Sequence, residues 1–143
     1  MRNPNEPRRD RGFSLIELLV VMIILGLITA LASQQFFGKL ETARRTSAKN
    51  QITELEGALD LFRLDVGRYP TAEEGLQALR AKPATAENWD GPYLKKDLPK
   101  DPWNKEYIYR RPGQHGDFDL LSFGPDGQEG GEGDGAADIV SWK

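Results

Sequence analysis

Residues 13–32 read FSLIELLVVMIILGLITALA, and this stretch decides how the rest of the chain is organised. Its 20 residues contain one charged side chain, the carboxylate of Glu17. An α-helix of that length rises by about 30 Å, which is the thickness of the hydrocarbon core of a membrane. The sequence therefore predicts a membrane-spanning helix that begins at Phe13.

A short basic segment precedes this helix. Residues 1–12 contain four arginines and two acidic side chains. Positive residues beside a membrane span favour the cytoplasmic side of the membrane. We therefore expect residues 1–12 to stay in the cytoplasm and everything after the span to be exported.

The composition limits what the exported part can do. The protein has 143 residues, a net charge of -3 and no cysteine, which excludes disulfides and thiolate metal sites. The chain lacks a basic stripe with interleaved aromatic residues, which argues against nucleic acid as a partner. His115 is the only histidine, and no nucleophile paired with a base or phosphate-binding glycine loop is recognisable. These features favour a structural protein over an enzyme.

The helix is expected to continue past the membrane span. No proline occurs between Gly38 and Val66, and strong helix formers are frequent there. Spacings of three and four residues define one apolar face, made of Ile52, Leu55, Leu59 and Phe62. Gly67 and Pro70 then predict that the helix ends at about Val66.

The C-terminal part is predicted to form a small antiparallel sheet. Thr71 and Glu74 fit a capping box that would start a second helix. Asp101–Trp103 is expected to lock the loop before the first strand. Alternating apolar residues and turn signals predict strands at 106–110, 118–123 and 139–142. The expected fold class is α+β, with a long N-terminal helix packed on this sheet.

Three interpretations of the N-terminus are open on these residues. The span can be a plain signal anchor, in which Glu17 has no function. It can be a signal peptide, because Ala30–Ala32 matches an A-x-A cleavage site and Arg8–Arg9 suggests a twin-arginine signal. It can also belong to a mature protein whose leader is cut after Gly12.

The third interpretation explains the acidic residue. The apolar run is longer than the roughly 7–15 residues of a signal-peptide core, and an acid at the centre of a membrane span costs about 2.5–3.5 kcal/mol. Cleavage between Gly12 and Phe13 would create an α-amine that is largely cationic at neutral pH. This amine would lie four residues from Glu17 on the same helix face, and the amine of a neighbouring subunit is an equally suitable partner. We therefore favour a filament subunit.

The junction itself resembles a known signature. Residues 11–21, RGFSLIELLVV, are similar to the prepilin signature of type IV pilins and type II secretion pseudopilins. In those proteins, prepilin peptidase cuts after the glycine and N-methylates the new terminal phenylalanine. The resemblance therefore implies cleavage between Gly12 and Phe13 and methylation of Phe13. A role for Glu17 in assembly is predicted from its pairing with the α-amine, rather than from the resemblance.

Six further motifs narrow the resemblance to the major pseudopilins of type II secretion. In order, they are RYPT at 68–71, EGLQAL at 74–79, GPYL at 91–94, DPW at 101–103, GQHG at 113–116 and FGPDG at 123–127. The resemblance implies a pilin-like fold in three parts. These parts are a leader at 1–12, a transmembrane and filament-core helix at 13–37, and a periplasmic domain at 38–143.

The implied function is that of a homopolymeric pseudopilus subunit. Such a filament grows from the bacterial inner membrane and drives folded proteins through the outer membrane. The implied partners are further copies of the chain, prepilin peptidase, the minor pseudopilins and the inner-membrane platform of the secretion machinery. Two alternatives stay open, namely a type IV pilus major pilin and a periplasmic binding module held by a signal anchor. Many type IV pilins close their C-terminal region with a disulfide, which this chain cannot do.

The resemblance also implies that calcium binds in the loop of residues 123–138. By position, the expected ligands are the carboxylates of Asp126 and Asp138 and the backbone carbonyls of Phe123 and Gln128. A family acid directly before Asp138 is replaced by Ala137, and Asp134 is the candidate substitute. Calcium takes roughly six to eight oxygen ligands, and glycines let the backbone turn around the ion. The alternative is a solvated, glycine-rich segment without metal.

Overall fold

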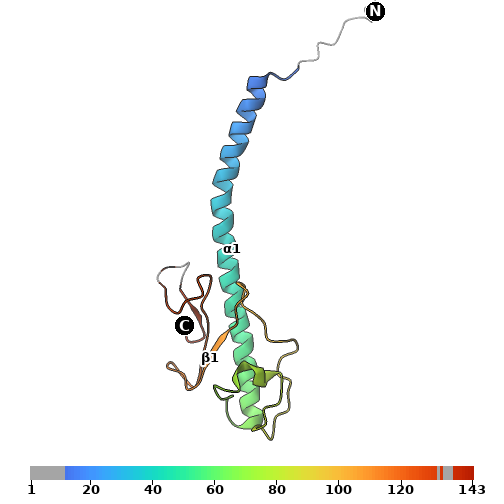
Figure 1. Cartoon of the computed structure of the whole chain (residues 1–143), viewed down its shortest axis with the longest axis vertical. Coiled ribbons are helices and arrows are strands. Elements are labelled where there is room, and N and C mark those ends of the chain that lie inside the picture. The colour runs from blue at the N-terminus through green and yellow to red at the C-terminus, as the bar shows by residue number, and fades with distance from the viewer. Residues whose placement is uncertain (1–11, 132, 134–136) are drawn as a thin grey trace, which may run out of the picture. The chain divides into compact units, whose positions relative to one another are not determined.

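The chain forms one long helix followed by a small mixed domain. A computed structural model describes residues 12–131, 133 and 137–143, without the side chains of residues 33–36. Two compact units are present, an N-terminal unit (Met1–Lys39) and a C-terminal unit (Leu40–Lys143). The elements in Figure 1 are α1 (Leu15–Val66), the 3₁₀ helix η1 (Gly75–Leu79), β1 (Ile108–Arg110), β2 (Asp119–Ser122) and β3 (Ile139–Val140).

The ends of α1 follow from local chemistry. The helix begins at Leu15, two residues later than the predicted Phe13, and the backbone N–H of Leu18 donates to the carbonyl of Ser14 at 3.1 Å. The helix ends at Val66, as predicted, because the next residue turns left-handed. Gly67 has a φ of 82°, and its N–H donates to the carbonyl of Arg63 at 2.8 Å. Glycine reaches this conformation without steric cost, so it caps the helix.

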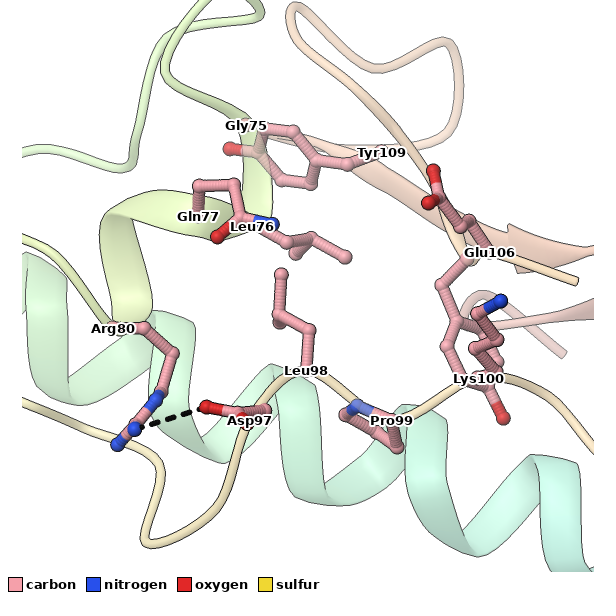
Figure 2. A pocket seen from close by; sticks show the side chains of 11 residues that line it. Gly75, Leu76, Gln77, Arg80, Asp97, Leu98, Pro99, Lys100, Glu106 and Tyr109 are labelled. Carbon is pink, nitrogen blue, oxygen red and sulfur yellow. Dashed lines mark hydrogen bonds and ion pairs between the residues drawn. The ribbon is translucent and has the colours of Figure 1, made fainter.

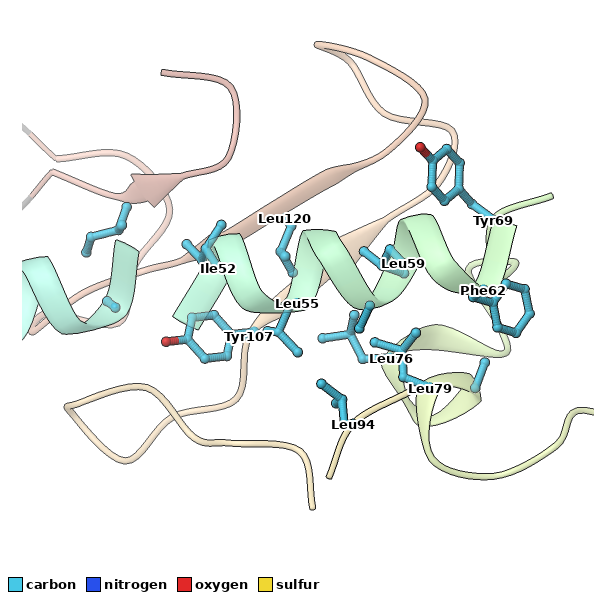
Figure 3. Packing of buried hydrophobic residues seen from close by; sticks show 14 of the residues in the cluster. Ile52, Leu55, Leu59, Phe62, Tyr69, Leu76, Leu79, Leu94, Tyr107 and Leu120 are labelled. Carbon is cyan, nitrogen blue, oxygen red and sulfur yellow. The ribbon is translucent and has the colours of Figure 1, made fainter. Parts of the chain in front are cut away.

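The hydrophobic core lies in the C-terminal unit. All four residues of the predicted apolar face of α1 are buried, with exposures of 0–2%: Ile52, Leu55, Leu59 and Phe62. Against this face pack side chains from η1, the following loops and the sheet, including Leu76, Leu79, Leu94, Tyr107 and Leu120 (Figure 3). Ile139 of β3 belongs to the same cluster. The burial of these four residues confirms the prediction, made from their spacing, that the domain packs on one face of α1.

The sheet is antiparallel and has the order β1-β2-β3. Ile108 pairs with Leu121, which in turn pairs with Val140. The three strands lie within the predicted ranges but are shorter. The α+β fold class is confirmed.

The predicted helix after Thr71 is wrong beyond its first turn. The capping box itself forms, since the N–H of Thr71 donates to Glu74 Oε2 at 2.7 Å and the N–H of Glu74 donates to Thr71 Oγ1 at 3.2 Å. Gly75 follows with a φ of 56°, a left-handed conformation that interrupts an α-helix. The chain then continues as the five-residue 3₁₀ helix η1.

Candidate functional sites

The first half of α1 has no partner for its apolar surface within the described chain. The large apolar side chains between Phe13 and Leu31 are 44–88% exposed. By length and composition α1 is able to cross a membrane, and its most apolar stretch is 0% buried. Apolar surface of this extent in water is unfavourable, at about 25 cal/mol per Å². The segment therefore needs a membrane or other protein chains around it.

The predicted processing junction is accessible. Gly12 and Phe13 precede α1 in an irregular conformation, and Phe13 is 82% exposed. A Cβ added at Gly12 would meet nothing within 4 Å. A peptidase therefore has room to reach the bond between these residues. Residues 1–11 of the predicted leader lie outside the described residues.

Glu17 lies in the first turn of α1 and is exposed. Its carboxylate makes no hydrogen bond or ion pair with any residue that the structure describes. The predicted pairing with an α-amine at Phe13 needs the cleaved chain, so it stays a prediction. The position is nevertheless suitable, because acids near a helix N-terminus are favoured by the helix dipole.

The loop after β2 contains the predicted metal ligands. Asp126 is exposed, and its Oδ1 accepts a hydrogen bond from the N–H of Gln128 at 3.2 Å. Asp138 Oδ2 accepts from the N–H of Gly130 at 2.9 Å, which fixes the carboxylate over the loop. The second oxygen, Asp138 Oδ1, is buried and has no hydrogen-bond partner among the described residues. A buried carboxylate oxygen without a partner is costly unless a donor or a cation satisfies it.

Less is known of the other three predicted ligands, Phe123, Gln128 and Asp134. Phe123 directly follows β2 and is half-buried, while Gln128 is exposed. Asp134 lies outside the described residues, so its predicted role as a substitute ligand stays a prediction. Among residues 12–131, 133 and 137–143, no three acidic or histidine side chains gather as a metal-binding group. Glu129 is engaged elsewhere, because Arg110 donates to both of its oxygens at 2.6 and 2.9 Å.

Three contacts that the sequence did not predict connect this loop to the domain. Arg45 of α1 donates from Nη2 to the carbonyl of Ala137 at 2.8 Å. Lys105 donates from Nζ to the carbonyl of Gly124 at 3.0 Å. Ser122 Oγ accepts from the N–H of Gly124 at 3.1 Å. No sequence pattern marks the first two contacts, because they join segments that only the folded chain brings together, whereas the Ser122–Gly124 bond is local.

The turn before β1 is locked as predicted. Asp101 is 4% exposed, and its Oδ1 accepts from the N–H groups of Trp103 and Lys105 at 3.0 and 2.8 Å. Its Oδ2 accepts from Ser122 Oγ at 2.6 Å, which joins this turn to the end of β2. Asp101 thus connects the turn to the start of the candidate metal loop.

Two other features have structural explanations. His115 lies between β1 and β2, and its ring stacks on Trp142 with centroids 4.0 Å apart. A cavity of about 500 Å³ lies between η1 and the segment before β1 (Figure 2). Leu76 and Leu98 extend toward each other across it, and the Arg80–Asp97 ion pair at 3.2 Å lies at one side. These side chains do not form a nucleophile–base arrangement.

The exposed apolar helix, the acid near its start and the small α+β domain define the class of pilin-like filament subunits. Two family models cover the chain. The model described as "Prokaryotic N-terminal methylation motif" matches residues 7–33, and the model described as "Type II secretion system (T2SS), protein G" matches residues 35–142. The chain therefore belongs to the type II secretion system protein G family.

Similar proteins agree with this assignment. A type II secretion system core protein G of Vibrio cholerae is 45% identical over 138 residues, covering 94% of this chain and 93% of that protein. One from Pseudomonas aeruginosa is 46% identical over 140 residues, covering 94% and 96%. The crystal structure of the major pseudopilin from the type 2 secretion system of enterohaemorrhagic Escherichia coli matches with a TM-score of 0.64 and 41% identity. That match covers 73% of this chain and 87% of that chain.

Proposed function

We propose that this chain is the structural subunit of a type II secretion pseudopilus. The main observation is the first half of α1, which follows a methylation motif and exposes all of its described side chains. A filament core buries such helices against one another, as a membrane does before assembly. The protein G match over residues 35–142 supports a pseudopilin over a type IV pilin.

The proposal includes a defined processing step. Prepilin peptidase cuts between Gly12 and Phe13 and methylates the amine of Phe13. The leader remains on the cytoplasmic side, and the C-terminal unit lies in the periplasm. The methylation motif over residues 7–33 and the accessible Gly12–Phe13 bond support this step. The minor pseudopilins and the inner-membrane platform are the further partners that this function requires.

In the filament, Glu17 is proposed to pair with the α-amine of Phe13 of the same or a neighbouring subunit. The carboxylate is without a partner in the described chain, and the amine exists only after cleavage. In an apolar core an unpaired carboxylate is strongly unfavourable, so the pair favours subunits at the correct stagger. The role of the protein is thereby mechanical, and export of folded proteins follows from filament growth rather than from catalysis by this chain.

Calcium binding in the loop is a separate part of the proposal. The donor set is made of carboxylate and carbonyl oxygens, which suits a hard divalent cation. The buried Asp138 Oδ1, which has no hydrogen-bond partner in the part of the chain that the structure describes, supports this fit. Asp126 and Asp138 would supply carboxylates, and Phe123 and Gln128 would supply carbonyls. Bound calcium would neutralise these groups and hold the two ends of the loop together.

Intact mass and N-terminal sequencing of the protein co-expressed with prepilin peptidase test the function. We expect a mature chain that begins at N-methylated Phe13 and forms short filaments. A chain that begins at Ser33 would establish a signal peptide, and one that retains Met1 would favour a membrane-anchored binding module. Long surface fibres from a correctly cleaved chain would instead indicate a type IV pilin.

A further inference from the structure

The side chain of Lys105 is seated in the first turn of the loop. Its Nζ donates to the carbonyl of Gly124 at 3.0 Å and to the carbonyl of Pro125 at 3.1 Å. A Cβ built on Gly127 would lie 2.3 Å from this nitrogen, so the turn closes directly around the ammonium. Gly127 has a φ of 70°, which together with its missing side chain makes this approach possible. A positive charge therefore already occupies this turn.

The backbone of Lys105 is fixed from the other side. Its N–H donates to Asp101 Oδ1 at 2.8 Å, and its carbonyl accepts from the N–H of Asp101 at 2.8 Å. Asp101 also accepts from Ser122, which is fully buried and which accepts in turn from the N–H of Gly124. Lys105 and the turn that it enters are thus attached to the same buried network. The ammonium is held there by the fold and is not a side chain that meets the loop by chance.

The charge of Lys105 has a consequence for a metal in the same loop. An ammonium and a divalent cation within one loop repel each other. The ammonium alone satisfies the carbonyls of Gly124 and Pro125, and so holds the turn without a metal. We propose that Lys105 is a built-in counter-cation of this loop, which stabilises it without calcium and weakens calcium binding when the metal arrives. Lys105 would therefore set the calcium concentration at which the loop fills. This inference rests on the proposed calcium site.

Two effects of removing the ammonium oppose each other, and the contacts indicate which one dominates. Loss of repulsion tightens calcium binding, whereas loss of order in the turn weakens it. The turn keeps two restraints that do not involve Nζ, namely the Ser122–Gly124 bond and the bond from the N–H of Gln128 to Asp126. Because the turn remains held, the loss of repulsion is expected to dominate. Lys105 and calcium then act as partial substitutes for each other.

Lys105→Met tests the proposal on the full chain in detergent micelles. Calcium affinity is measured by titration calorimetry from chelated protein, and thermal unfolding is followed in chelator. We expect the variant to unfold at a lower temperature in chelator and to bind calcium roughly three to ten times more tightly, as repulsion of this kind predicts. The gain in affinity should shrink at high ionic strength, because salt screens the repulsion. Lys105→Arg retains the positive charge, so its calcium affinity should not rise as that of Lys105→Met does.

The matched control is Lys96→Met, which changes the net charge equally. Lys96 is exposed and forms no hydrogen bond or ion pair with the described residues. The calcium affinity of Lys96→Met should therefore differ from that of the wild type by less than about twofold. If Lys105→Met does not fold, Lys105→Gln keeps a donor for the carbonyls and removes only the charge. Calcium affinity that is unchanged or weaker in the neutral variant, or an unaltered unfolding temperature in chelator, would overturn the proposal.

These outcomes also separate the inference from its basis. Wild-type protein that shows no saturable calcium binding would refute both the calcium site and the role of Lys105. Calcium binding that depends on Asp126 and Asp138 but not on Lys105 would refute the role of Lys105 alone. Neither result bears on the pseudopilus subunit, which is tested by cleavage at Phe13 and by filament formation.

Discussion

The two halves of α1 obey the same helical geometry but bury their apolar residues in different ways. From Leu40 onward the helix has one buried stripe, formed by residues such as Ile52 and Leu59, and its other faces are exposed. Before that point every described side chain is exposed, including Leu25 at 55%. The second half completes its core within its own chain, whereas the first half requires surroundings that the chain does not supply.

This difference assigns the stability of the protein to one half and its assembly to the other. A substitution in the stripe should unfold the C-terminal unit, because its contacts are internal. A substitution in the first half should leave that unit intact and act only where membrane or neighbouring subunits are present.

The same substitution in the two halves should give opposite results. Leu59→Ala removes a fully buried side chain, so the free energy of unfolding should fall by about 2–5 kcal/mol. Leu25→Ala should leave it unchanged. Urea unfolding of the full chain in detergent, followed by tryptophan fluorescence, measures this, because all three tryptophans lie in the C-terminal unit.

Leu64→Ala is the control within the second half. Leu64 is 79% exposed on the same helix, so its loss should change the free energy of unfolding by no more than about 0.5 kcal/mol. A large effect of Leu25→Ala in this assay would contradict the separation of the two halves.

Calcium should stabilise only the C-terminal unit. At about 100 times its dissociation constant, a ligand that binds only the folded state adds about 2.7 kcal/mol. We expect chelation to lower the unfolding temperature of the wild type, and both Asp126→Ala and Asp138→Ala to abolish this response. The measurement is circular dichroism melting with calcium and with chelator.

Glu129→Gln is the control within the loop. Its carboxylate is paired with Arg110, so the response to calcium should be retained. Equal unfolding temperatures of the wild type with calcium and with chelator would remove the calcium proposal, while the pseudopilus subunit would remain.

The predicted and unpredicted parts of the structure differ in the range of the interactions that form them. The end of α1 at Val66 and the stripe through Leu59 were predictable, because a cap and a helical period are local. The second helix was predicted wrongly, because the capping box at Thr71 is a strong local signal. Gly75 permits a left-handed conformation without requiring it, so the sequence does not show that the helix is interrupted there.

Long-range contacts explain why the candidate loop was only partly predicted. Its ligands followed from a motif, but the side chains that hold it did not. Arg45 reaches Ala137 across 92 residues, and Ser122 reaches Asp101 across 21. Hydrogen bonds of this kind depend on the tertiary fold, and the spacing of residues within one helix or strand does not predict them.

Acid should weaken the C-terminal unit through one partly buried ion pair. Arg68 donates to both oxygens of Glu74 at 2.7 and 2.8 Å, and these bonds lower the pKa of Glu74 to about 2. A depressed pKa stabilises the folded state above the usual value of 4.5, and this contribution disappears as the pH falls from 4.5 toward 2. Glu74→Gln should therefore cost about 2 kcal/mol at pH 7 and progressively less in acid.

Urea unfolding of the wild type and Glu74→Gln between pH 7 and pH 2.5 measures this convergence. Glu73→Gln is the neighbouring control, since Glu73 is exposed, and it should have almost no effect at any pH. A difference between the wild type and Glu74→Gln that stays constant over this range would exclude the ion pair as its cause.

The smallest expected effect on free energy concerns the first half of α1. If Glu17 pairs with an α-amine in the filament, Glu17→Gln should reduce filament yield by about tenfold, which corresponds to about 1.4 kcal/mol per added subunit. Membrane insertion, cleavage before Phe13 and unfolding of the C-terminal unit should remain normal, because Glu17 is exposed and makes no hydrogen bond or ion pair with the described residues. Filament yield after shearing, compared with intact mass and urea unfolding, separates these properties.

Glu17→Asp retains the charge and should assemble better than Glu17→Gln. Normal filaments from Glu17→Gln would show that the helices pack by their apolar surface alone, and the carboxylate would then have no part in setting the stagger between subunits.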